Sequence, residues 1–86
     1  MNHNEQIKPL RKKIAEIDDA IITLIEARLE IVNKIWKIKK ENKIELRDKK
    51  KERELIEKLK EKSRLNPQII EILYQQIFEE NQRIYG

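Results

Sequence analysis

The 86-residue sequence contains no cysteine, which excludes disulfide bonds and thiolate chemistry. It has one histidine, His3, in a polar N-terminal segment, and one histidine alone cannot form a metal site. Glycine occurs only as the last residue, proline occurs twice, and aromatic residues make up 5%. Because 42% of the residues are charged and helix breakers are scarce, the composition favours long helices with a solvated face.

Long hydrophobic runs are also missing. Nowhere do about 18 uncharged apolar residues follow one another, and residues 1–8 contain no apolar run of the kind found in signal peptides. We therefore expect a cytoplasmic protein with no membrane partner. The 20 basic residues are interleaved with 16 acidic ones, and the densest basic run, RDKKKER at residues 47–53, holds two carboxylates. This mixture argues against nucleic acid as a partner.

The longest pattern is the stretch LRKKIAEIDDAIITLIEARLEIVNKIWKIK at residues 10–39. Pro9 suits the first turn of a helix, so we predict one helix from Pro9 to about Asn42, roughly 33 residues and 50 Å long, after a flexible leader at residues 1–8. Steps of four and three define one row: Leu10, Ile14, Ile17, Ile21, Leu24, Arg28, Ile31, Ile35 and Ile38. A second row beside it contains Ile22, Ile25, Leu29, Val32, Trp36 and Lys39.

Two shorter helices are predicted after residues 41–47. Asp48 can cap a second helix that ends near residues 62–64, and Asn66 followed by Pro67 marks the start of a third. The inward row of the third helix is Ile70, Leu73, Ile77, Asn81 and Ile84.

A second chain is expected to complete the core. A single domain of 86 residues buries only about 60% of its unfolded surface, and the long helix has an apolar arc too wide for one neighbour. We predict an all-α fold of three helices per chain in an intertwined homodimer.

Charged residues interrupt the apolar rows of the long helix. Arg28 could form an internal salt bridge, for example to Glu52, extend its head to the solvent, or bind an anionic ligand. Lys39 lies eleven residues on, within about 20° of the same azimuth and about 16 Å along the axis, so both can reach an anion placed between them. Acidic residues of the second helix could satisfy the same pair.

Arg11 lies about 25 Å before Arg28 and roughly 100° away in azimuth. It can approach the same ligand only from another chain, or it is an ordinary exposed residue. Asp48 and Glu52 are one turn apart with Lys51 beside them, a pattern that suits either a helix cap with a surface pair or a binding site. Asn81 and Tyr85 extend the inward row of the third helix and could line a cavity.

The chain resembles the all-helical chorismate mutases in three successive stretches: residues 10–39, then RDKKKERELIEKL, then NPQIIEILYQQIFEENQRIY. These enzymes occur alone or fused to prephenate dehydratase or dehydrogenase, and the resemblance covers nearly the whole chain. It implies a dimer of three-helix chains with two active sites, each completed by an arginine of the partner. Matched residue by residue, Arg11 is that arginine, Arg28 and Lys39 bind the carboxylates and ether oxygen of chorismate, Asp48 offers a backbone contact, and Glu52 meets the ring hydroxyl.

Two positions, Lys51 and Tyr85, depart from the family pattern, and Asn81 is a mild change. Lys51 stands where an arginine is usual, Tyr85 where a glutamine or glutamate faces the ether oxygen, and Asn81 where serine is common. The substrate-binding residues implied by the resemblance are Arg11, Arg28, Lys39, Asp48, Lys51, Glu52, Asn81 and Tyr85, of which Arg28, Lys39 and Tyr85 are the catalytic candidates.

The activity implied is the rearrangement of chorismate to prephenate, without cofactor or metal, in the shikimate pathway of aromatic amino acid biosynthesis. Two alternatives share the fold. One is an isochorismate pyruvate lyase, and the other is a catalytically weakened, mutase-like regulatory or dimerisation module. A basic helical nucleic-acid binder would explain the charge but not the polar residues within the apolar rows.

Overall fold

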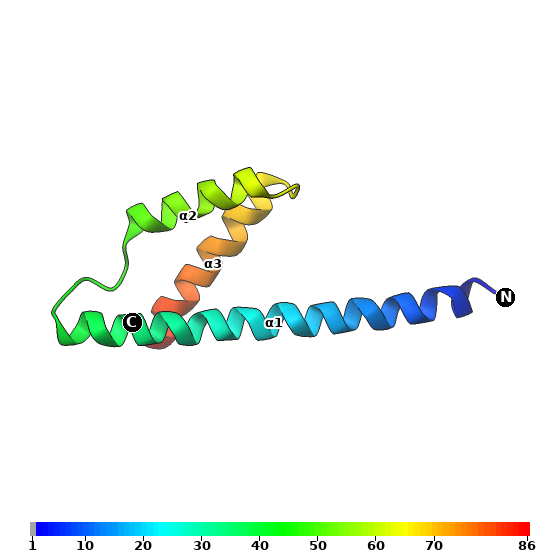
Figure 1. Cartoon of the computed structure of the whole chain (residues 1–86), viewed down its shortest axis with the longest axis horizontal. Helices are drawn as coiled ribbons and strands as arrows, with labels where there is room; N and C mark the ends of the chain where they lie inside the picture. Colours follow the sequence, from blue (N-terminus) through cyan, green and yellow to red (C-terminus); the bar gives the residue numbers. More distant parts are fainter. Residues whose placement is uncertain (1) are drawn as a thin grey trace.

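The computed structural model describes residues 2–86 and consists of three α-helices (Figure 1). They are α1 (His3–Glu41), α2 (Lys49–Lys62) and α3 (Pro67–Tyr85). No strand is present in the described part of the chain. The predicted all-α class with one long and two shorter helices is confirmed.

The start of α1 corrects the prediction. The helix begins at His3 rather than Pro9, because the side chain of Asn2 caps it by accepting a hydrogen bond of 2.8 Å from the backbone N–H of Glu5. The carboxylate of Glu5 also lies in the first turn, where the helix dipole favours negative charge. Pro9 is therefore inside the helix, and residues 3–8 are helical where we expected a flexible leader. Met1 lies outside the described residues.

The other helix ends follow the sequence signals. At the end of α1 the backbone of Lys43 adopts a φ of 56°, and the N–H of Ile44 donates to the carbonyl of Lys39 at 2.8 Å, which turns the chain away from the helix. Asp48 caps α2 by accepting from the N–H of Lys51 at 3.1 Å. Asn66 caps α3, which starts at Pro67 as predicted.

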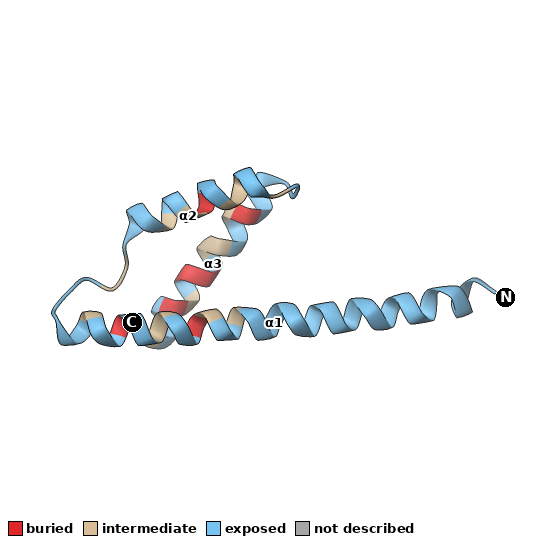
Figure 2. Ribbon diagram, in the orientation of Figure 1, coloured by how far each residue is buried: buried red, intermediate tan, exposed pale blue. Residues whose placement is uncertain are grey.

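α3 is the element that packs against both other helices (Figure 1). Its buried residues Ile70 and Phe78 form a core with Ile56 of α2, against which Leu55, Leu59 and Tyr74 are packed. The buried residues of α1, Leu29 and Trp36, lie in its C-terminal half, where α3 crosses it (Figure 2). The core is therefore small and confined to one end of the long helix.

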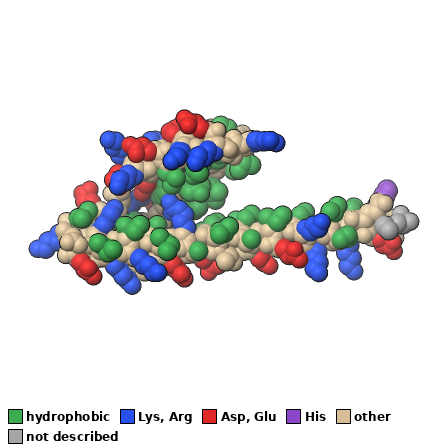
Figure 3. All heavy atoms as spheres, in the orientation of Figure 1, with side chains coloured by type: hydrophobic (Ala, Val, Ile, Leu, Met, Phe, Trp, Pro, Cys, Tyr) green, Lys and Arg blue, Asp and Glu red, His purple; other side chains and the backbone are tan. Residues whose placement is uncertain are grey.

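The N-terminal half of α1 extends away from the other helices with an uncovered apolar row (Figures 1 and 3). The hydrophobic members of the row that contains Arg28 are 47% to 68% exposed. The radius of gyration is 17.5 Å, compared with about 12 Å for a compact domain of this length. This row stays exposed because α2 and α3 do not cover it, so the core of the single chain is incomplete. None of the helices within residues 2–86 combines the length and the apolar character needed to span a membrane.

Candidate functional site

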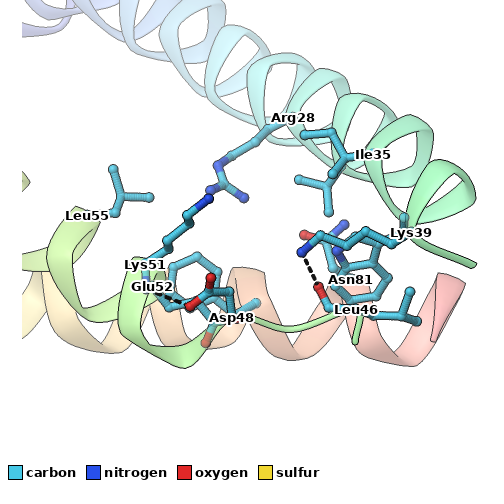
Figure 4. A pocket seen from close by; sticks show the side chains of 12 residues that line it. Arg28, Ile35, Lys39, Leu46, Asp48, Lys51, Glu52, Leu55 and Asn81 are labelled. Atoms are coloured by element: carbon cyan, nitrogen blue, oxygen red, sulfur yellow. Dashed lines mark hydrogen bonds between the residues drawn. The ribbon is translucent and has the colours of Figure 1, made fainter. Parts of the chain in front are cut away.

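A cavity of about 310 Å³ lies between the C-terminal half of α1, the start of α2 and the end of α3 (Figure 4). Apolar side chains form much of its wall, and six of the residues predicted to bind substrate complete it. The lining residues are Arg28, Val32, Ile35, Trp36, Lys39, Leu46, Asp48, Lys51, Glu52, Leu55, Phe78 and Asn81. Residues far apart in the sequence therefore form one site, which is the size of a small-ligand pocket.

Three cations converge on this cavity. Arg28 and Lys39 project from one face of the unbroken α1, as their spacing predicts, and Lys51 projects from the first turn of α2. Figure 4 shows the side chains of Arg28 and Lys51 pointing toward one another across the cavity. None of the ion pairs found within residues 2–86 involves any of these three cations. Their mutual repulsion makes the cavity a place where a small polyanion is stabilised.

Arg28 is half-buried, and its guanidinium carbon lies 5.6 Å from the ring centre of Tyr74 and 5.5 Å from that of Phe78. Contacts with the negative faces of aromatic rings partly compensate a buried cation. A salt bridge to Glu52, one of the alternatives drawn from the sequence, is not formed, because Glu52 pairs with Arg47. The guanidinium of Arg28 therefore lies close to two aromatic rings at the wall of the cavity.

Lys39 is held by the connection between α1 and α2. Its Nζ donates a hydrogen bond of 2.9 Å to the backbone carbonyl of Leu46, the residue two positions before the cap of α2. An ammonium group carries three N–H bonds. One is used by Leu46, so two others can be donated to a ligand in the cavity.

The two carboxylates of the site have separate partners. Asp48 is exposed and its side chain caps α2, whereas Glu52 is half-buried and accepts two hydrogen bonds from Arg47, at 2.8 and 3.0 Å. Arg47 also donates to Glu79 of α3 at 3.1 Å. The hydrogen bonds with Glu52 raise the pKa of the Arg47 guanidinium above its usual range, so this guanidinium stays charged at all ordinary pH values.

Asn81 is the polar residue of the α3 core row, and its residue surface is 2% exposed. Its Nδ2 lies 3.5 Å from the carbonyl oxygen of Leu29, a long hydrogen bond that fixes the amide weakly. Trp36 and Phe78, which line the same cavity, are buried. An amide beside such apolar walls supplies a neutral donor and acceptor at the edge of the cationic cavity.

Two predicted site residues lie outside the cavity of the single chain. Arg11 is exposed on the projecting half of α1, and one continuous helix separates it from Arg28 by about 25 Å. Tyr85 is half-buried at the end of α3, and its backbone carbonyl accepts a hydrogen bond of 2.7 Å from Lys40. Neither residue contributes to the lining.

Two features of the site were not anticipated from the sequence. One is the carbonyl of Leu46, and the other is Arg47, which lies just outside the cavity and holds Glu52. Both belong to a connection without periodicity, so no pattern assigns them a direction. The only sequence signal for Arg47 is its place immediately before a capping aspartate, five residues ahead of a glutamate.

Comparison with known proteins points to one family. The model of the family described as chorismate mutase type II matches residues 10–84. No match was found among the curated proteins, and none among the solved structures.

Proposed function

Because the chain belongs to the type II chorismate mutase family, we propose that it rearranges chorismate to prephenate in the cavity between α1, α2 and α3. The observation that carries this proposal is the convergence of Arg28, Lys39 and Lys51 on one apolar-walled cavity. Three lining cations that form no ion pair within residues 2–86 suit a small substrate with two carboxylates. Chorismate has that charge.

The reaction requires positioning rather than a reactive side chain. In one concerted step the C–O bond of the enol ether breaks while a C–C bond forms, and no proton is transferred. The barrier falls when the dianion is held in its compact diaxial form and when positive charge lies beside the ether oxygen as its bond breaks. A preorganised cavity with fixed cations can supply both effects.

The charged lining residues and Asn81 then each have a role. The guanidinium of Arg28 and the ammonium of Lys51 bind carboxylates, while Lys39, held by Leu46, donates to the ether oxygen and to a carboxylate. The carboxylate of Glu52 accepts from the ring hydroxyl, and the backbone near Asp48 lines the same side. Asn81 adds a neutral hydrogen bond from the buried wall.

A second copy of the chain completes this arrangement. The exposed apolar row of α1 needs a partner, and a twofold axis would cover that row with the same row of another chain. In such a homodimer the partner's Arg11 supplies the remaining carboxylate contact. Arg11 cannot make this contact in its own chain, because it lies about 25 Å from Arg28 along one continuous helix. Tyr85 becomes a catalytic donor only if its hydroxyl turns toward the cavity, and this stays a prediction from the resemblance.

The proposed activity would make the protein a cofactor-independent isomerase of aromatic amino acid biosynthesis in the cytoplasm. Its test is to incubate the purified protein with chorismate, follow the loss of chorismate absorbance, and identify the product by NMR. We expect prephenate. A second incubation, with isochorismate, tests the lyase alternative, which release of pyruvate would identify. Binding of a dicarboxylate transition-state analogue without turnover would identify a non-catalytic module.

A further inference from the structure

Arg47 joins three parts of the molecule around the proposed site. It lies in the connection after α1, and its Nε and Nη2 donate to the two carboxylate oxygens of Glu52 in α2 at 3.0 and 2.8 Å. Its Nη1 donates to Glu79 of α3 at 3.1 Å. The side chains of Arg47 and Glu52 are each only 17% exposed. A bidentate pair of this kind fixes both distance and orientation, and it is stronger than an exposed one.

The pairing determines what Glu52 can do in the cavity. Glu52 lines the same cavity as Arg28 and Lys51, which point toward one another there (Figure 4). Without Arg47, the glutamate would be free to rotate and pair with one of these cations, which would occupy a group that the substrate needs. An uncompensated carboxylate would also repel a dianionic ligand. Arg47 holds Glu52 from outside the cavity and compensates its charge.

The same residue anchors the loop that holds Lys39. Leu46 precedes Arg47, and its carbonyl accepts from the Nζ of Lys39 at 2.9 Å. With its side chain bound to α2 and α3, Arg47 fixes the backbone on which this carbonyl is placed. One guanidinium outside the cavity thereby influences an acceptor and a cation inside it.

We infer that Arg47 is a positioning residue of this site: it keeps the carboxylate of Glu52 turned to the substrate hydroxyl and away from Arg28 and Lys51. The inference rests on the proposed function. Because a contact between Glu52 and a ring hydroxyl exists in both ground and transition states, its loss acts mainly on KM. A purely structural role would instead lower stability and leave KM and kcat near those of a comparable variant.

The chain offers a matched control for this comparison. Arg53 forms an equivalent two-nitrogen pair with Glu71 that joins α2 to α3, away from the cavity. We expect Arg47→Gln to raise KM for chorismate about tenfold with a smaller change in kcat, while Arg53→Gln changes both less than about twofold. Arg47→Lys keeps the charge and one contact, and it should restore part of the loss. If Arg47→Gln does not fold, as judged by circular dichroism, Arg47→Lys against Arg53→Lys makes the same comparison.

A double variant tests whether Arg47 acts through Glu52. Once Glu52→Gln has removed the carboxylate, adding Arg47→Gln should raise KM less than about twofold further, because the two residues form one unit. Full additivity of the two effects, or an Arg47→Gln variant with the kinetics of Arg53→Gln, would overturn the inference while wild-type turnover persists. A wild-type protein without chorismate turnover would overturn the proposed function, and the inference with it.

Discussion

The Nζ of Lys39 lies 2.9 Å from the carbonyl oxygen of Leu46 and donates a hydrogen bond to it. This contact ties the cation of α1 to the connection that leads into α2. It places the ammonium at the cavity wall before any ligand arrives, so its reorganisation on binding is small.

Removal of the Lys39 ammonium should affect the chemical step most strongly. Loss of one preorganised donor to a developing oxyanion costs about 2.7–4 kcal/mol, so Lys39→Ala should lower kcat by about 10²–10³-fold. The control is Lys37→Ala, an exposed lysine two residues earlier in the same helix. Steady-state kinetics with chorismate check this, and equal kcat values for the two variants would show that Lys39 is not at the ether oxygen.

Restoring a guanidinium at residue 51 should improve substrate binding. Lys51 lines the cavity but can offer a carboxylate only a point charge, whereas arginine donates two parallel hydrogen bonds. We expect Lys51→Arg to lower KM severalfold, with Lys50→Arg, at an exposed neighbouring position, close to wild type. An unchanged or higher KM in Lys51→Arg would mean that the lysine already has its best partner.

Glu71 should make the stability of the fold depend on pH in the acid range. Hydrogen bonds from Arg53, then Lys60 and Gln75, lower the pKa of Glu71 from its usual 4.5 to about 2. A depressed carboxyl pKa contributes stability above the unfolded-state value, and this contribution is lost as the pH falls from 4.5 toward 2.

The measurement is the melting temperature as a function of pH. Glu71→Gln should melt below wild type at pH 7 and show a flatter decline between pH 4.5 and 2. Glu61→Gln, an exposed change near the end of α2, should keep the wild-type slope. If Glu71→Gln and wild type decline in parallel, the Glu71 cluster does not contribute to acid stability.

The sequence predicts most of the fold because its signals are local and periodic. The caps at Asp48 and Asn66 and the unbroken apolar rows determine where α2 and α3 begin and why α1 is long. The start of α1 differs from the predicted one because two signals compete. Pro9 suits a first turn, yet the Asn2 cap stabilises six further residues ahead of it.

The site could be predicted only where helical geometry determines direction. Arg28 and Lys39 share a face of one helix, so eleven residues of spacing were enough to bring them to one cavity. Arg47 lies in an aperiodic connection, and its pairing with Glu52 and Glu79 depends on how α2 packs on α3. The role of Arg11 depends on a second chain, so its place in the site stays a prediction.

A mixing experiment tests most directly whether each active site is built from two chains. Arg11→Ala and Arg28→Ala should each abolish most chorismate turnover as pure proteins. When equal amounts are unfolded and refolded together, half of the dimers pair unlike chains, and each of these has one intact site. We predict recovery of roughly a quarter of the wild-type rate. No recovery above the two parent variants would contradict the account, as would full activity of Arg11→Ala alone.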